Sequence, residues 1–456
     1  MRKKLSVFYH KLSNLSGIHL IVLFYCSAAL LSTLLLSIPF FYREGVEVSW
    51  LDSIFTAVSA ISVTGLTVVS TADTFNTFGY FALAFVLQFG GIGIMTLGTF
   101  VYILLGKKIG IRTRRLIQID QNRNTLAGLV QLMLKILRTV LAIELVGAIV
   151  LSIYYLKYFD SWQESIVQGV FAAVSATTNA GFDITGTSLE PFAHDYFVQF
   201  INILLLVLGA IGFPVLLEVQ ELLWGRYRDL KWKYQFSLFA KVTTVTFFIL
   251  IVIGALGIFL FEHNHFLQDK SWHESLFYSL FQSVTTRNGG LATMDVAEFT
   301  TPTLLLLCAL MFIGASPSSV GGGIRTTTFA IMMLAIFHYA KGHNTIKVFK
   351  REVDPDDVTR SFIVAITAIM LCGSAIVFLI WLEPLSNMAI VFEVFSAFGT
   401  TGLSLGITPD LSAIGKIVII LMMFIGRIGI FSFLFLIRGD DVHDRYHYPK
   451  EKMIIG

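Results

Sequence analysis

The chain has 456 residues, of which 55% are hydrophobic and only 14% are charged, and its mean hydropathy is +0.76. So apolar a chain has too little polar surface to stay in water, which excludes a soluble globular protein and indicates a multi-span membrane protein. The net charge of +3 is unevenly placed, because most of the 33 Lys and Arg lie at 1–19, 107–138, 226–241, 341–360 and after residue 437. The positive-inside rule puts these stretches and both termini in the cytoplasm.

Eight apolar stretches are each long enough to cross a hydrocarbon core, which needs about 20 residues of helix. They cover residues 20–41, 78–105, 133–156, 196–224, 236–261, 303–338 (interrupted), 361–382 and 412–437. The first follows basic residues, as a signal peptide would, but its apolar run is too long and no small-residue cleavage site follows. We therefore expect it to be a retained helix.

A short glycine motif recurs four times along the chain. It reads Val63-Thr64-Gly65-Leu66, Asn179-Ala180-Gly181-Phe182, Asn288-Gly289-Gly290-Leu291 and Thr400-Thr401-Gly402-Leu403, with glycines 116, 109 and 112 residues apart. This period predicts a fourfold internal repeat. The repeats are expected at 20–110, 111–230, 231–345 and 346–438, between an N-terminal segment at 1–19 and a tail at 439–456.

An apolar segment too short to span a membrane precedes each motif. Three of these segments open with Ser-Trp, at Ser49, Ser161 and Ser271, and a serine at a helix start accepts hydrogen bonds from free N–H groups. They lie on the charge-poor side between spans, which predicts re-entrant pore helices entering from outside. The expected fold is an all-α integral membrane protein: four covalently linked span–pore-helix–span repeats, with eight transmembrane helices and four re-entrant pore loops, around one pore.

The second helix of each repeat carries a signature of small residues, 24 to 28 residues beyond the motif glycine. The four signatures are Gly90-Gly91-Ile92-Gly93, Gly209-Ala210-Ile211-Gly212, Gly314-Ala315-Ser316-Pro317 and Gly426-Arg427-Ile428-Gly429. Such residues allow either close helix packing or a helix break.

The four glycine motifs together predict a cation filter. Backbone carbonyls can replace a potassium ion's hydration shell when they all face one axis, and glycine tolerates the backbone conformations that this requires. The expected ion-binding residues are Val63, Thr64, Gly65, Thr178, Asn179, Ala180, Gly181, Asn288, Gly289, Gly290, Thr400, Thr401 and Gly402. In the third motif Gly289 could replace Gly290. Arg287 would repel a cation, so we expect it behind the filter, bracing the backbone on a carboxylate such as Glu274 or Glu393.

The sixth apolar stretch is interrupted in its middle. Proline and three consecutive glycines cannot continue a helix comfortably, and the break falls below the expected filter. Two readings remain: a passive kink, or a flexible loop at 314–326 that plugs the pore. The expected gate residues are Gly314, Ser316, Pro317, Ser318, Ser319, Gly321, Gly322, Gly323, Arg325 and Arg427, with Arg325 as a loop anchor.

Charged residues within the spans need partners or a wet cavity. Arg427 either sets an electrostatic barrier under the filter or pairs with a carboxylate, possibly the C-terminal one at a subunit interface. Glu144 and Glu218 are interpreted as bundle ion pairs or interface groups rather than proton relays. Cys26, Cys308 and Cys372 fall within predicted spans and suggest no disulfide or metal site. No acid/base pair, metal-spaced cluster, nucleophile elbow or nucleotide motif points to an enzyme or to an organic cofactor.

In these motifs the chain resembles the Trk/Ktr/HKT superfamily of potassium transporters, and within it the membrane subunits of bacterial Ktr systems. The resemblance implies four repeats around one pore, with the third filter glycine at Gly290. It also implies a homodimer with two pores in the bacterial plasma membrane, surrounded by lipid. A cytosolic KtrA-like ring partner of the regulator-of-potassium-conductance (RCK) type would bind adenine nucleotides and shift the 314–326 loop. Sodium would be a possible activator.

The expected function is therefore gated, potassium-selective uptake, with a sodium-preferring transporter of the same fold as the alternative. The four motif glycines favour potassium, since relatives with serine at the first position tend toward sodium. A membrane enzyme or a non-conducting scaffold would leave the four motifs unexplained. The basic stretches serve as topology signals or as docking surfaces for the cytosolic partner, and no nucleic acid is expected to bind.

Overall fold

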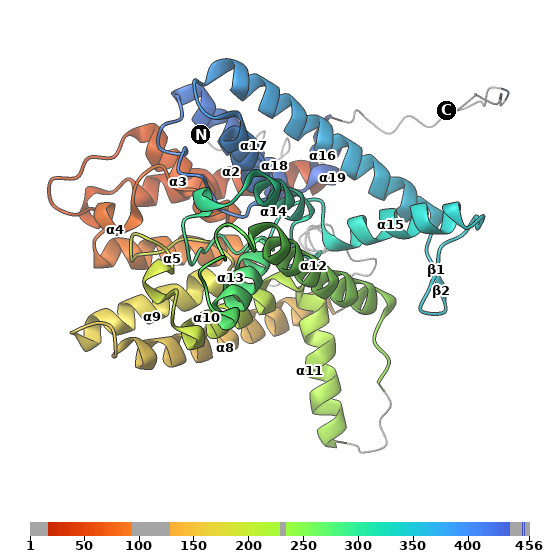
Figure 1. Cartoon of the computed structure of the whole chain (residues 1–456), viewed down its shortest axis with the longest axis horizontal. Coiled ribbons are helices and arrows are strands. Elements are labelled where there is room, and N and C mark those ends of the chain that lie inside the picture. Colours follow the sequence, from red (N-terminus) through yellow and green to blue (C-terminus); the bar gives the residue numbers. More distant parts are fainter. Residues whose placement is uncertain (1–16, 94–127, 229–233, 438–448, 450, 452–456) are drawn as a thin grey trace, which may run out of the picture.

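The computed structural model describes residues 17–93, 128–228, 234–437, 449 and 451, and the regular structure in this part of the chain is mostly helical (Figure 1). The principal elements are α2 (Gly17–Leu36), α3 (Trp50–Ser62), α4 (Thr71–Thr74), α5 (Thr77–Ile92), α8 (Leu129–Tyr155), α9 (Trp162–Thr177), α10 (Tyr196–Ala210), α11 (Phe213–Arg228), α12 (Leu238–Glu262), α13 (Trp272–Thr285), α14 (Thr301–Ile313), α15 (Thr326–Ala340), α16 (Pro355–Leu382), α17 (Asn387–Gly399), α18 (Ala413–Ile428) and α19 (Ile430–Ile437). Short 3-10 turns lie at Pro39–Phe41, Glu190–Phe192 and Val296–Glu298.

The expected end segments fall largely outside this description. Most of 1–19 and of the 439–456 tail, the end of the first repeat at 94–110, and much of the basic stretch at 107–138 are not described. In the described part, strands are confined to one antiparallel pair, β1 (Lys347–Val348) and β2 (Arg351–Glu352), which joins α15 to α16. The hairpin stands at one extremity of the molecule, and α11 projects from the body (Figure 1).

Four of the described helices are individually long and apolar enough to cross a membrane. They contain or coincide with His19–Leu36, Leu129–Tyr155, Leu238–Glu262 and Pro355–Leu382, and each opens one of the predicted repeats. Only 28–33% of the residues in their apolar windows are buried inside the chain. Their remaining apolar surface faces outward, where lipid would cover it.

The second helix of each of the last three predicted repeats is interrupted. α10 and α11 meet at an angle of 104°, α14 and α15 are separated by the loop after Ile313, and α18 gives way to α19. The breaks coincide with glycines in the left-handed region, at Gly212 (φ +102°), Gly314 (+72°) and Gly429 (+89°), and Gly93 (+93°) follows the end of α5 in the same conformation. The stretches expected as spans at 196–224 and 412–437 therefore each contain a break. In these helices the small-residue signature marks a break, because a positive φ ends the helical hydrogen-bond ladder.

The short helices α3, α9, α13 and α17 form the interior. Each packs on the long helix of its own quarter of the chain: α3 on α2, α9 on α8, α13 on α12, and α17 on α16. Each also packs on the second helix of the preceding quarter: α9 on α5, α13 on α10, α17 on α14, and α3 on α18. These contacts close into a cycle that joins the first quarter to the last. The predicted starts of three short helices are confirmed, since Ser49, Ser161 and Ser271 cap α3, α9 and α13.

Candidate ion filter and gate

Within three residues of its end, each short helix is followed by a non-glycine residue with a left-handed backbone. These residues are Val63 (φ 57°), Asn179 (53°), Asn288 (71°) and Thr400 (50°), all fully buried. The next residue in each case returns its N–H to a helix carbonyl: Thr64 to Ser59 (2.8 Å), Ala180 to Ser175 (2.8 Å), Gly289 to Thr285 (2.6 Å) and Thr401 to Ser396 (2.9 Å). This geometry resembles a helix C-cap whose reversed chain is directed inward. We call the four segments filter strips 1 to 4: 63–65, 179–181, 288–290 and 400–402.

The four strip-end glycines meet in a ring. All have positive φ, at 93°, 68°, 68° and 94° for Gly65, Gly181, Gly290 and Gly402. A Cβ built on Gly65 would lie 3.0 Å from Gly181 Cα, one on Gly181 2.9 Å from Gly290 Cα, one on Gly290 3.4 Å from Gly402 Cα, and one on Gly402 3.0 Å from Gly65 Cα. The backbones therefore approach so closely that each position leaves no room for a side chain.

The ring resolves which glycine of strip 3 takes part. Gly290 has the positive φ and the ring contacts, whereas a Cβ on Gly289 would lie 2.7 Å from Oγ1 of Thr285, back on its own helix. Thr178 is also placed away from the ring. Its hydroxyl donates to the Val174 carbonyl at 2.6 Å, and a Cβ on Gly91 of α5 would lie 2.6 Å from Thr178 Cβ. The Thr178 side chain thus packs on α5 instead of facing the strips.

Four helix hydroxyls that the sequence analysis missed support the strips. Ser59 and Ser396 accept the N–H of Gly65 and Gly402, each at 3.1 Å. Ser175 and Thr285 donate to the carbonyls that follow the other two ring glycines, Phe182 O at 2.5 Å and Leu291 O at 2.6 Å. One hydroxyl in the last two turns of every short helix is the sequence signal that would have found them.

Arg287 lies behind the filter, as expected, but its predicted carboxylate partner is wrong. The side chain is 1% exposed and donates to two carbonyls at the end of α14, Gly314 O at 3.3 Å and Leu310 O. A cation at a helix C-terminus satisfies free carbonyls and matches the helix dipole. Glu274 instead caps α13 through Ser271, and Glu393 accepts hydrogen bonds from Ser404 and Thr408.

The loop between α14 and α15, which we call the gate loop (residues 314–326), is a packed structure. Its backbone pairs with the α10–α11 break: Ser316 N donates to Ala210 O at 3.1 Å, and Phe213 N donates to Ser318 O at 2.9 Å. Pro317 takes part in the same contact between the loop and the α10–α11 break, since a Cβ on Gly212 would lie 2.9 Å from the Pro317 carbonyl oxygen.

Within the loop, polar side chains hold the turns together. Ser319 Oγ donates to Ser316 O at 2.7 Å, and Thr326 Oγ1 donates to Ser316 Oγ at 3.1 Å. Gly314 and Gly323 face each other closely, because a Cβ on Gly323 would lie 2.9 Å from Gly314 Cα. These hydroxyl groups therefore steady the packed loop.

Two arginines anchor the gate loop. Arg325, with φ +81°, donates to the Gly321 carbonyl, and its own N–H bonds Ile313 O at 2.9 Å. Arg427 is 7% exposed and donates to Val320 O of the loop and to Gly90 O of α5. In the described part of the chain Arg427 therefore binds two backbone carbonyls, and a carboxylate at the C-terminus lies outside that part.

The carboxylates expected in helix-bundle ion pairs have other partners. Glu144 Oε2 accepts from the amide of Gln88 at 2.6 Å, which links α8 to α5 without a cation. Glu218 accepts from the N–H (2.9 Å) and the hydroxyl (2.6 Å) of Ser237, the N-cap of α12. Among the described residues neither carboxylate pairs with a cation, and the alternative that both are interface groups stays a prediction.

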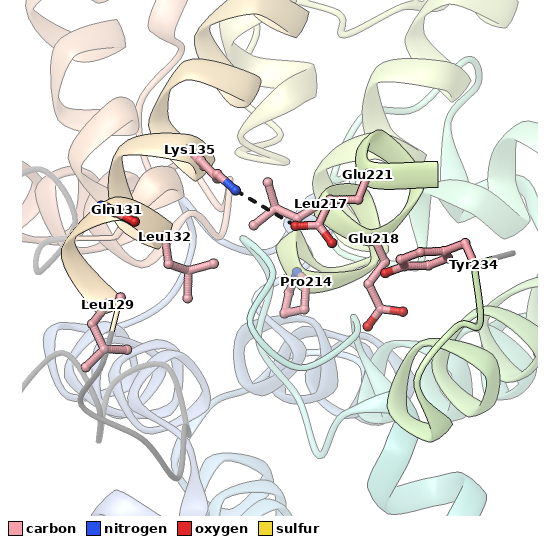
Figure 2. Close-up of a pocket in the computed structure, with 10 residues that line it drawn as sticks. Leu129, Gln131, Leu132, Lys135, Pro214, Leu217, Glu218, Glu221 and Tyr234 are labelled. Carbon is pink, nitrogen blue, oxygen red and sulfur yellow. Dashed lines mark ion pairs between the residues drawn. The ribbon is translucent and has the colours of Figure 1, made fainter. Parts of the chain in front are cut away.

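A cavity of about 410 Å³ lies apart from the filter, between the start of α8 and α11 (Figure 2). Polar side chains from both helices line it, and Lys135 and Glu221 face each other across it at 3.8 Å. No filter or gate residue contributes to its lining. Among the described residues, no group of three His, Cys, Asp or Glu could hold a metal, and the three cysteines are free.

Comparison with known families decides the membership of the chain. A family model described as TrkH, cation transport protein, matches residues 12–441. The chain belongs to the TrkH family of cation transport proteins. Members of this family are membrane transporters, which agrees with the long apolar helices and with the expectation of a non-enzymatic, multi-pass protein.

Several curated relatives match over nearly their full length. The Ktr system potassium uptake protein D of Bacillus subtilis (strain 168) is 56% identical over 97% of this chain and 98% of its own. The Ktr system potassium uptake protein B of the same strain is 33% identical over 90% of each chain. The potassium/sodium uptake protein NtpJ of Enterococcus hirae is 33% identical over 97% of this chain and 98% of its own.

A solved structure has the same fold. The potassium transporter TrkH from Vibrio parahaemolyticus superposes with a TM-score of 0.73 over 93% of this chain and 85% of that chain, at 20% identity. The mostly helical architecture is therefore that of TrkH.

Proposed function

We propose that this chain is the ion-translocating subunit of a Ktr-type potassium uptake system. The observation that carries the proposal is the ring of four glycines at the ends of four equivalent strips, built from quarters of the chain far apart in sequence. The names of the similar Ktr proteins supply the ion. Eight spans and four re-entrant pore helices would surround the ring, with both termini in the cytoplasm.

In this proposal, potassium loses its water at the strips. Val63, Asn179, Asn288 and Thr400 are left-handed, as are the ring glycines, and this turns the backbone so that successive carbonyls can face one axis. The middle residue of each strip supplies a further carbonyl; these residues are Thr64, Ala180, Gly289 and Thr401. Thr178 contributes its carbonyl at most, because its hydroxyl is already bonded to its own helix.

The gate loop closes the path below the filter. It is clamped by Arg427 and Arg325, and its glycine-rich end carries no side chains that would prevent movement. A KtrA-like cytosolic ring of the RCK type, binding adenine nucleotides, would shift the loop in a homodimer of two such pores. Sodium would act as an activator, and no organic cofactor is needed on this chain.

The second candidate is a sodium-preferring transporter of the same architecture. It is favoured by one observation, the 33% identity to a protein named for potassium and sodium uptake. Glycine at all four ring positions supports potassium instead, because no side chain is present there and only backbone oxygens can contact an ion in the ring.

The test is uptake in a bacterial strain that lacks its own potassium importers, with and without a cognate ring subunit. Rescue of growth at low potassium, with potassium preferred over sodium and uptake raised by the ring, is the expected result. Uptake that sodium competes for better than potassium would favour the second candidate. A correctly inserted chain that moves neither ion with a matched ring would overturn both.

A further inference from the structure

The glycine-rich end of the gate loop lies against the filter itself. A Cβ built on Gly321 would lie 2.6 Å from Oδ1 of Asn288, and one built on Gly322 would lie 2.7 Å from Oγ1 of Thr400. Asn288 and Thr400 are the left-handed residues of strips 3 and 4, two positions before the ring glycines. All four residues are buried. The loop therefore packs on two of the four filter strips.

Strips 1 and 2 have a different support at the equivalent place. There the left-handed residue is covered by a glycine of a regular helix: Gly90 of α5 lies beside Val63, and Gly209 of α10 lies beside Asn179. Built Cβ atoms on these glycines would lie 2.6 Å from Val63 Cγ2 and 3.2 Å from Asn179 Cγ. Strip 3 thus relies on a loop residue where strips 1 and 2 rely on a helix. Movement of the loop would remove packing from strip 3 that the other two retain.

The amide of Asn288 lies between the gate loop and strip 4. It makes the hydrogen bonds that join strip 3 to strip 4, and we call this contact between the two strips the seam. Its Nδ2 donates to Thr400 O at 3.0 Å, to Thr400 Oγ1 at 2.9 Å, and to Gly399 O. Its Oδ1 is buried, has no hydrogen-bond partner, and faces Gly321. A buried oxygen without a donor is costly, so departure of the loop would both hydrate this oxygen and free the amide to move.

We propose that Asn288 is a positioning residue that couples the gate loop to the filter. The packed loop holds the Asn288 amide on strip 4 and so fixes the seam between strips 3 and 4, and the seam loosens when the loop leaves. This inference rests on the proposed functions of the gate loop as a gate and of the strips as a potassium filter. Coupling is reciprocal, so a loop that changes the filter's affinity for potassium is itself biased, by the same factor, by potassium in the filter.

Two substitutions, one that enlarges residue 321 and one that shortens residue 288, test the contact between the gate loop and strip 3. In Gly321→Ala the new methyl group meets the Asn288 amide, so the loop should be displaced, with higher ring-independent flux and weaker discrimination of potassium from sodium. Asn288→Ala removes the polar group that the methyl strikes and leaves only the Cβ of Ala315, which a Cβ on Gly321 would approach to 2.7 Å. The double variant should therefore have ring-independent flux at least about threefold below that of Gly321→Ala alone, as expected for residues in contact.

Two matched controls accompany these substitutions. Asn179→Ala changes the equivalent residue of strip 2, whose amide donates to Arg287 O at 3.3 Å. Asn179 packs on α10 and not on the gate loop, so the effect of Asn179→Ala on flux should simply add to that of Gly321→Ala. Gly373→Ala in α16, where an added Cβ meets no atom within 4 Å, should leave flux unchanged. Additive effects for the Asn288 pair, or the same rescue by Asn179→Ala, would overturn the coupling. Failure of the unaltered chain to transport would instead overturn the proposed function.

A second measurement applies even if Gly321→Ala does not fold. Ser319→Cys, in a chain whose native cysteines are replaced by serine, reports loop exposure through its rate of labelling by a water-soluble maleimide. Potassium should change that rate when Asn288 is present and leave it unchanged in Asn288→Ala. An equal potassium effect in both chains, or none in either, would contradict the inference.

Discussion

At the scale of single residues, the filter strips hold backbone conformations that their side chains do not prefer. Val63 and Thr400 are β-branched yet left-handed, with φ of 57° and 50°. Such residues cost about 1–3 kcal/mol each and persist only where the surroundings enforce them. Here the surroundings are complete burial and the bond from the next N–H back to the helix. Strain of this kind is concentrated at functional sites, which agrees with an ion filter.

The first prediction concerns Gly290→Ser. Gly290 has φ +68°, and a Cβ there would lie 2.7 Å from Gly181 Cα and closer still to the Thr401 carbonyl oxygen. Backbone strain of about 1–3 kcal/mol is a factor of roughly 5 to 150 in an equilibrium, and we expect the preference for potassium over sodium to fall by about tenfold. Competition between the two ions in an uptake assay measures it. Unchanged selectivity would remove Gly290 from the filter, and Gly373→Ser is the control.

At the scale of elements, the helices are tied to one another by polar contacts at their ends. Lys416 at the start of α18 donates to Asp52 in the first turn of α3 at 2.8 Å, joining the last quarter of the chain to the first. Glu262 and Glu383, at the ends of α12 and α16, accept hydrogen bonds from Thr300 and Ser412, the caps of α14 and α18. These contacts fix the helices that carry the strips.

The second prediction concerns Asp52→Asn and pH. Partial burial raises the pKa of Asp52, but hydrogen bonds from Lys416 and Ser49 outweigh it and leave that pKa below its ordinary value. A lowered folded-state pKa stabilises the protein above the ordinary pKa, and the stabilisation is lost as pH falls through the folded value. At neutral pH, Asp52→Asn should cost about 1 kcal/mol or less.

Thermal unfolding of the detergent-solubilised chain measures this difference across pH. The gap between the unaltered chain and Asp52→Asn should be present at neutral pH and narrow below the ordinary pKa of the carboxyl. A gap that widened in acid would contradict the assignment, and Asp73→Asn, on the exposed turn of α4, provides the control.

The third prediction concerns removal of residues 316–322 from the gate loop. These residues carry the backbone bonds to α10 and α11 and the Val320 carbonyl that Arg427 holds. Their removal should raise flux in the absence of the ring subunit. Tracer uptake into liposomes, with and without the ring, measures the change. Undiminished dependence on the ring would count against a gate.

At the scale of the whole molecule, the contacts of the short helices form a cycle that closes between α3 and α18. Because each short helix is held by the quarter before it, the ring of glycines depends on all four quarters at once. A single chain thereby builds a nearly fourfold centre whose strips nevertheless differ. Amide side chains join strip 2 to Arg287, just before strip 3, and strip 3 to strip 4, whereas Val63 brings no such group to strip 1.

The fourth prediction concerns topology. If the basic stretches are cytoplasmic, the β1–β2 hairpin lies inside and the loop between α12 and α13 lies outside. In a cysteine-free background, Asp269→Cys on intact cells should react with a membrane-impermeant maleimide, and Lys350→Cys should react only after lysis. Both side chains are exposed on the chain, so lack of access would reflect the membrane. The reverse pattern would invert the orientation.

The sequence carried enough information to predict the short helices, the four strips and the broken sixth stretch, because glycine, proline and capping serine act locally. The 104° bend after Ala210 was only one of two readings of its small-residue signature, because the apolar pattern continues through the bend. The partners of Arg287, Arg427 and Glu144 were missed for another reason. Backbone carbonyls and a neutral amide satisfy these groups, and such acceptors leave no complementary charge in the sequence to search for.

The most direct test of the central claim is anomalous diffraction from crystals of the chain in which rubidium or thallium replaces potassium. The account predicts anomalous density on the axis enclosed by Gly65, Gly181, Gly290 and Gly402, weakened when potassium competes and absent when sodium alone is present. Ordered strips with no density on that axis, or density only elsewhere in a chain that transports potassium, would contradict it.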